Sequence, residues 1–387
     1  MIEVPKALDP RAVLNTKLTW RVAMQLLAGG LFGASISYAF LSSGIKIAPP
    51  SAPPLLVMGV VMVGFVIAFA VNVLVHEIGH ALAARMAGGS VLRVVLGPWR
   101  WERVRQGYRL RKIRTIRGVS GFVQSLLPAD QRFRRAMSMM VLGGPFANLL
   151  LAALGWWLLA VVEMHYAPRI MMLELTVFAL MLGGINLLPF TAAGFLTDGG
   201  HLRRLWTQPQ AALRYLQMIR LARASLDGKR PRDFDPRELD AMEATDLSPM
   251  DVFFIQTTRA SMLSDRGDLL GARSLNADTL KNWHQLPDGF RQQSALAEAL
   301  ACAQIDHDPV RAREWLALAE GGLIEEFHYA AARVVIAELE GDPITREMSI
   351  AQVRQGIEDS IYLGDVAVLR DKLREWERGP ADLLTTA

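Results

Sequence analysis

The sequence predicts a mainly α-helical, polytopic membrane protein with about four transmembrane helices, a small membrane-associated β-hairpin and a C-terminal soluble α-helical repeat domain. Three observations support this fold class. Long apolar runs with almost no charge fill the first half of a chain that is 51% hydrophobic. A basic stretch with alternating side chains separates two of these runs. After residue 205 the pattern is that of ordinary amphipathic helices.

Apolar runs bound the predicted membrane spans, which cover residues 20–42, 54–86, 136–162 and 170–188. The second span starts at Pro53-Pro54, where proline favours the beginning of a helix. At about 1.5 Å per residue this span is longer than a hydrocarbon core of about 30 Å, so we expect it to place His76 below the membrane surface. Residues 1–19 are expected to be a cytoplasmic segment rather than a cleavable signal.

The linker between the second and third spans predicts the orientation of the protein. Its basic residues are Arg93, Arg100, Arg103, Arg105, Arg109, Arg111, Lys112, Arg114, Arg117, Arg132, Arg134 and Arg135, against the acidic Glu102 and Asp130. By the positive-inside rule this linker is cytoplasmic. With an even number of spans, both termini are then cytoplasmic as well.

Residues 91–117 of this linker are expected to form a β-hairpin that lies against lipid headgroups. Trp99 and Trp101 alternate with charged neighbours, and Gln106-Gly107 suits the turn. A basic stretch is also typical of nucleic-acid binding. The alternation favours a strand at the membrane instead, so we expect no nucleic-acid partner.

The strongest chemical signal is the pentapeptide His-Glu-Ile-Gly-His at 76–80, which closes the apolar run of the second span. On a helix, His76 and His80 lie on one face, so both imidazoles can bind one tetrahedral Zn²⁺. Glu77 beside them is the candidate general base, and a metal-activated water is the implied nucleophile. The alternative is a chance match, which is expected in on the order of one chain in a hundred of this length.

Two further motifs follow in order along the chain. The third span contains Gly-Pro-Phe-Ala-Asn at 144–148, and the fourth ends in Asn-Leu-Leu-Pro at 186–189, which leads into Asp-Gly-Gly at 198–200. Catalytic zinc needs a third protein ligand, and Asp198 is the candidate. Over roughly residues 50 to 205 these three elements resemble the site-2 protease family of intramembrane zinc metalloproteases, peptidase family M50.

The resemblance implies one Zn²⁺ per chain, bound by His76, His80 and Asp198, with Glu77 as the acid/base residue. It implies that Asn186 lies near the substrate backbone or the developing oxyanion, and Pro189 and Asn148 are the other substrate-binding candidates. A strand-forming insertion after the first motif would hold the substrate extended. The implied location is a bacterial cytoplasmic membrane.

The interval between Asn186 and Asp198 is about four residues longer than is usual in the family. The insertion at 191–197 can loop out, which leaves the placement of Asp198 open. Asp198 could instead cap the next helix. Asn186 could be a satisfied polar residue before a helix-ending proline, and Asn148 could hydrogen-bond between helices.

The C-terminal part divides into linker helices at 206–247 and a helical-repeat domain at 248–387. Gly-Asp at 267–268 begins a segment that resembles the one at Asp308, with weaker echoes at Asp342 and Asp365. Spacings of about 40 and 34 residues resemble tetratricopeptide repeats, in which the Asp would begin the second helix of each pair. The expected role is to bind a protein partner or to control substrate access, with plain stabilisation as the alternative.

The leading hypothesis from the resemblance is an intramembrane zinc metalloprotease that cuts transmembrane protein substrates near the cytoplasmic face, in regulated intramembrane proteolysis. The alternative is a catalytically inactive, membrane-anchored helical-repeat scaffold. A di-iron membrane hydroxylase would need more histidine clusters than the chain's 7 histidines provide. The lone Cys302 excludes an internal disulfide and is expected to be a small buried side chain.

Overall fold

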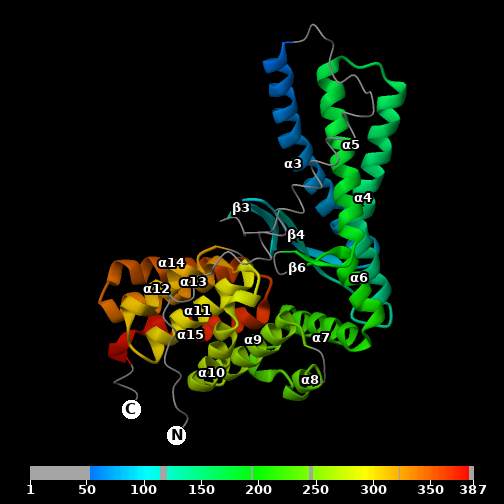
Figure 1. Ribbon diagram of the computed structural model, residues 1–387. Coiled ribbons are helices and arrows are strands. Elements are labelled where there is room, and N and C mark those ends of the chain that lie inside the picture. The colour runs from blue at the N-terminus through cyan, green and yellow to red at the C-terminus, as the bar shows by residue number, and fades with distance from the viewer. Residues whose placement is uncertain (1–52, 114–119, 193–194, 244–246, 322, 383–387) are drawn as a thin grey trace.

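A computed structural model describes residues 53–113, 120–192, 195–243, 247–321 and 323–382 of the chain. It has three parts, which follow one another along the molecule (Figure 1). A bundle of long helices forms one end, a small β-sheet lies at the base of the bundle, and a domain of shorter helices lies on the far side of the sheet. The protein is therefore mainly helical, as the sequence predicts.

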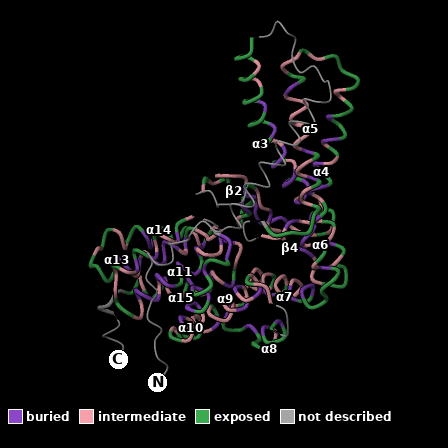
Figure 2. Tube along the Cα trace, viewed as in Figure 1, coloured by how far each residue is buried: buried purple, intermediate pink, exposed green. Residues whose placement is uncertain are grey.

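The bundle consists of α3 (Pro54–Met86), α4 (Phe133–Val161) and α5 (Tyr166–Leu187). Each is long and apolar enough to cross a membrane, so the protein is an integral membrane protein with three candidate spans among the described residues. The predicted spans 54–86, 136–162 and 170–188 correspond to these helices to within a few residues. The predicted span 20–42 lies outside the described residues. Large apolar side chains remain exposed along the bundle, as expected of a surface that faces lipid (Figure 2).

Glycine brings α3 and α4 into backbone contact at the level of the histidine pair. A Cβ atom on Gly79 would overlap the carbonyl oxygen of Gly143, and one on Gly143 would overlap that of Gly79. Membrane helices commonly pack through such small residues, because apolar side chains have no preference for each other over lipid. The close crossing places the motif of the third span directly beside His76 and His80.

The sheet contains β1 (Ser90–Leu96), β2 (Trp99–Val104), β3 (Gly107–Lys112) and β4 (Gly121–Leu126). All neighbouring strands are antiparallel, and their order is β3-β2-β1-β4. The predicted hairpin is present as β2 and β3, and β1 adds a further strand beside it. The sequence did not predict β4, because Gly-Phe-Val-Gln-Ser-Leu has no clear alternation of apolar and polar residues.

The two faces of the hairpin differ from the expected arrangement. Trp99, Trp101 and Leu110 are 50%, 51% and 62% exposed on one face, as a membrane-facing surface would be. Two arginines that were expected at lipid headgroups are buried against the helical domain instead: Arg93 and Arg100 are only 5% and 3% exposed. The expectation was wrong for these two residues, because the C-terminal domain supplies the oxygen acceptors that bind them.

Those acceptors form a compact charge network between the sheet and the helical domain. Arg93 donates to the carbonyl of Leu323 and pairs with Glu325, and Arg100 donates to the carbonyl of Ile324. Glu102 of β2 pairs with both arginines and with Arg111. Burial of a charge is tolerated only when it is paired and hydrogen-bonded, so this network fixes one domain against the other.

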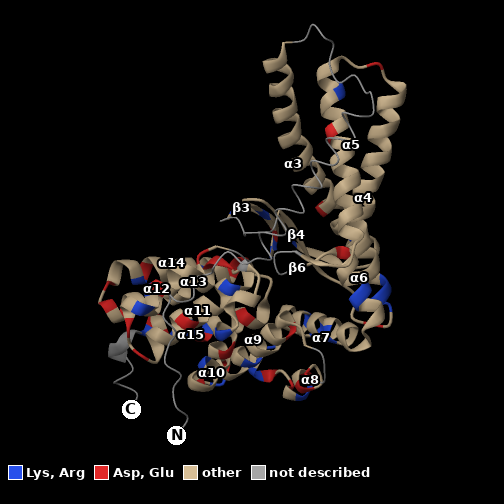
Figure 3. Ribbon diagram, in the orientation of Figure 1, with Lys and Arg blue, Asp and Glu red and all other residues tan. Residues whose placement is uncertain are grey.

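The helical part contains α6 to α15. Their bounds are α6 Asp198–Thr207, α7 Pro209–Leu226, α8 Pro236–Asp240, α9 Pro249–Asp265, α10 Leu269–Lys281, α11 Asp288–Gln304, α12 Pro309–Ala319, α13 Glu326–Glu340, α14 Pro343–Asp359 and α15 Leu363–Asp382. This domain carries charged residues of both signs, whereas the membrane helices carry almost none (Figure 3).

The repeated Asp residues begin helices. The side chains of Asp268, Asp308 and Asp342 cap α10, α12 and α14, and each accepts a hydrogen bond from a backbone N–H three residues later. An N-cap of this kind stabilises a helix start by about 1 kcal/mol. The fourth echo differs, because Asp365 lies within the first turn of α15. The closer resemblance to tetratricopeptide repeats stays a prediction.

Replacing Glu102 by Gln should loosen the contact between the sheet and the helical domain. The substitution leaves Arg93 and Arg100 buried without their shared carboxylate, and breaking a buried ion pair costs about 3–5 kcal/mol. Amide hydrogen exchange in detergent should show faster exchange in β2 and in residues 323–325. The matched control is Glu377→Gln, which removes an exposed pair with Arg354 and should leave exchange unchanged. Equal protection in both variants would contradict the role given to Glu102.

Candidate metal centre

Two imidazoles on α3 meet edge to face near the base of the membrane bundle. The Nε2 atoms of His76 and His80 lie 3.1 Å apart, and the two ring planes are perpendicular. Both side chains are buried. The four-residue spacing on an α-helix accounts for their common face, as the sequence predicts.

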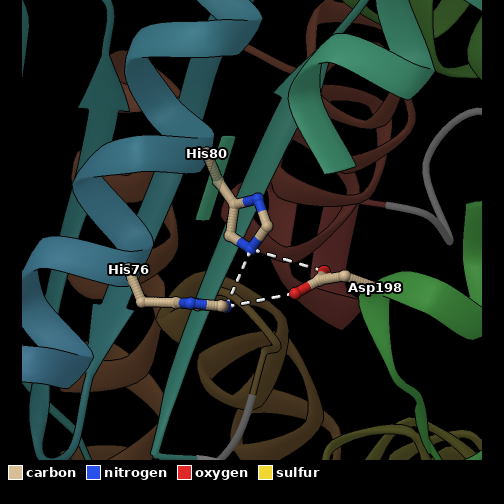
Figure 4. A group of neighbouring side chains, drawn as sticks. All are labelled: His76, His80 and Asp198. Atoms are coloured by element: carbon tan, nitrogen blue, oxygen red, sulfur yellow. Dashed lines mark hydrogen bonds and ion pairs between the residues drawn. The ribbon is translucent and has the colours of Figure 1, made fainter. Parts of the chain in front are cut away.

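Asp198 approaches the same point from α6, far along the chain (Figure 4). Its two carboxylate oxygens lie 3.2 Å from His76 Nε2 and 3.4 Å from His80 Nε2. Three zinc ligands at about 2.0–2.1 Å in tetrahedral geometry stand about 3.3–3.4 Å apart. The triangle of donor atoms therefore fits one tetrahedral ion, and among the described residues only these three form such a group.

The α4 backbone sets the orientation of the His80 ring. His80 Nδ1 lies 2.7 Å from the carbonyl oxygen of Met140, to which it can donate a hydrogen bond. A proton on Nδ1 leaves Nε2 with its lone pair facing Asp198, which is the tautomer that a metal ligand requires. Gly144 provides the space for both rings, because a Cβ there would overlap His80 Nε2 and lie 2.8 Å from His76 Nε2.

The insertion before Asp198 forms a small hairpin. β5 (Thr191–Ala192) pairs with β6 (Phe195–Leu196), so the extra residues loop out and the chain returns to the end of α5. Thr197, not Asp198, is the N-cap of α6, and its hydroxyl accepts a hydrogen bond from Gly200. The same hydroxyl donates to the carbonyl of Leu188. Asp198 is the first residue of the helix, and its side chain is free of the capping role that the sequence left open.

The helical domain holds α6 from its other end. Arg204 of α6 forms an ion pair with Asp251 of α9 and a hydrogen bond with Ser248. Near the start of α6, the ring of Phe195 contacts that of Phe290 on α11. The element that carries Asp198 is therefore fixed by the soluble domain as well as by the membrane helices. Sequence reasoning missed both contacts, because neither pair has a local signature.

Glu77 is buried and points toward the sheet rather than toward α4. Its carboxylate lies against the backbone of Gly121, and a Cβ atom on Gly121 would overlap the Glu77 side chain. Gly121 is the first residue of β4, and β4 is an edge strand of the sheet. The candidate general base thus lies between the histidine pair and a strand with one unpaired edge. The sequence offered no signal for the role of Gly121.

The other predicted residues are not part of the triangle. Asn186 is partly buried in the last turn of α5, and Pro189 follows that helix in an exposed position. Asn148 is fully buried on α4, one turn beyond Gly144. Neither amide atom of Asn148 has a hydrogen-bond partner among the described residues.

Residues 64–173 match the sequence profile of peptidase family M50. The chain carries a peptidase family M50 domain. The matched segment includes the His-Glu-Ile-Gly-His motif and ends before Asp198. Comparison with curated proteins and with solved structures found no match. This protein is therefore a metallopeptidase with membrane helices. It has three candidate spans and a His-His-Asp group that could bind a metal ion.

Replacing Gly144 by Ala should abolish metal binding by the M50 domain. The added methyl group would overlap the two Nε2 atoms and displace both imidazoles from the position of the metal. Metal content of the purified protein, measured by mass spectrometry, should fall from about one Zn²⁺ per chain to near zero. Gly184→Ala is the matched control on α5, because a Cβ there meets nothing within 4 Å. Full metal content in Gly144→Ala would contradict this geometry.

Proposed function

We propose that this protein is an intramembrane zinc metalloprotease that hydrolyses peptide bonds in or near transmembrane segments of membrane proteins, on the cytoplasmic side. The observation that carries the proposal is the convergence of His76, His80 and Asp198 at the base of three apolar helices. The M50 domain supports the same reaction class. Both termini would be cytoplasmic, in a bacterial cytoplasmic membrane, and the pathway would be regulated intramembrane proteolysis.

The three donor atoms would bind one Zn²⁺ per chain. Bound there, Zn²⁺ would supply Lewis-acid polarisation of the scissile carbonyl and activation of water. The carboxylate of Glu77 would take the proton of the attacking water and return it to the leaving amine. The hydrogen bond from His80 Nδ1 to Met140 would keep the imidazole in its ligand tautomer throughout.

The sheet offers a way to present the substrate. A transmembrane helix hides its carbonyls in hydrogen bonds, so cleavage needs a locally unwound segment whose backbone groups find new partners. The free edge of β4 begins at Gly121, directly beside Glu77. We infer that the substrate adds to β4 as an extended strand, a mode in which main-chain hydrogen bonds give affinity. Asn186, Pro189 and Asn148 remain candidates for substrate contact.

The helical hairpins after residue 248 are proposed to be tetratricopeptide-like and to bind a protein partner or control substrate access. Capping Asp residues at matching places in successive hairpins support this proposal. The contacts of α9 and α11 with α6 and its preceding hairpin support a role in access to the metal centre.

Replacing Glu77 by Gln should remove proteolysis and leave the metal in place. Loss of a general base typically costs about 10²–10⁴-fold in rate. The measurement is turnover of a fluorogenic transmembrane substrate by the purified protein, together with its zinc content. Equal turnover in wild type and Glu77→Gln would exclude the protease and favour a membrane-anchored scaffold.

Replacing Gly121 by Ala should slow the same reaction without loss of metal. The new methyl group displaces the Glu77 carboxylate, but it does not touch the histidines. We expect a fall in kcat of about 10²-fold. Gly59→Ala on α3 is the control, since its Cβ meets nothing within 4 Å. An unchanged kcat in Gly121→Ala would show that β4 does not set the position of Glu77.

A further inference from the structure

The helical domain contains a partly open cavity of about 260 Å³ that is separate from the candidate metal centre. Its walls come from α9, α10, α11, α13 and α15, so the successive hairpins curve around it. Much of the lining is apolar and includes Leu300, Val335 and Leu369. At about 30 Å³ for each water in the liquid, the space accommodates roughly nine water-sized groups.

Three ionisable side chains line this cavity and lie outside the ion pairs of the described residues. Asp365, Lys372 and His328 make no hydrogen bond or ion pair with any described residue. The other charged residues of the wall are paired: Asp265 binds Arg230, and Arg273 binds Glu298. Burial raises the pKa of Asp365 to about 6, with repulsion from Asp265 adding to the shift, and burial lowers the pKa of Lys372 against the opposing effect of Glu375 and Asp265. Both charged side chains are partly buried, and a ligand of opposite charge would pair with each of them.

The spacing of Asp365 and Lys372 limits the length of a ligand that pairs with both side chains. Asp365 and Lys372 lie seven residues apart on α15, which is about two helical turns and about 10.5 Å along one face. An extended peptide spans about 3.3–3.6 Å per residue, so three residues cover this distance. The lining also contains Gln293 and Gln304, whose amide groups can both donate to and accept from a peptide backbone.

We propose that this cavity binds a short peptide with free ends, about three residues long. Its terminal ammonium would pair with Asp365, and its terminal carboxylate would pair with Lys372. The apolar wall would receive the peptide's central side chain.

Binding in the cavity would bear on the metal centre. The helices α9 and α11 line the cavity, and the same two helices contact Arg204 and Phe195 on either side of Asp198. A ligand that orders these helices would thus act on the element that carries Asp198. The binding site itself does not depend on the proposed protease activity.

The test is native mass spectrometry of the full-length protein in detergent with a pool of Ala-Xaa-Ala tripeptides. We expect retention of one peptide per chain, and a loss of affinity of about tenfold or more when either end is blocked by acetylation or amidation. Asp365→Asn and Lys372→Met should each cause a similar loss. Exposed controls are Glu358→Gln and Arg370→Met, which should bind as the wild type does.

The proposal is overturned if the wild type retains no tripeptide, or if blocked peptides bind as tightly as free ones. It is also overturned if folded Asp365→Asn and Lys372→Met bind normally, with folding checked by circular dichroism. Should either variant fail to fold, the blocked peptides on the wild-type protein decide the matter.

Discussion

The close crossing of α3 and α4 is the constraint on which the candidate metal centre depends. Gly79 and Gly143 let the two backbones touch, and Gly144 then leaves an opening in which both imidazoles fit. A side chain at any of these positions would separate the helices or fill that opening. The same contact brings the carbonyl of Met140 to His80 Nδ1, so one packing event creates both the space and the correct tautomer.

The third corner of the triangle is supplied by the rest of the molecule. Asp198 reaches the histidines because Thr197 ties the start of α6 to the end of α5. Arg204 ties the same helix to Asp251 of the soluble domain. The element that carries Asp198 therefore contacts both the membrane bundle and the helical domain. A movement of α9 or α11 would displace Asp198. These contacts join the C-terminal helices to the element that carries Asp198.

The sheet between the two parts serves both of them through its two faces. Its exposed aromatic face suits the membrane interface, where Trp and Tyr are commonly found. Its charged face is buried against the helical domain through Arg93, Arg100 and Glu102. At the same time its edge strand β4 passes Glu77. A single layer thus contacts both the helical domain and the candidate general base.

By itself the sequence determined the elements whose signals are local. Apolar runs identified the three described spans. Helical spacing placed His76 and His80 on one face, and the alternation of apolar and charged residues identified the hairpin. Repeated Asp residues marked helix starts. Only the tertiary structure decided where the side chains of Asp198 and Glu77 point. It also decided which acceptors bind Arg93 and Arg100. These outcomes rest on contacts between segments far apart in the chain, and no local pattern of residues encodes such distances.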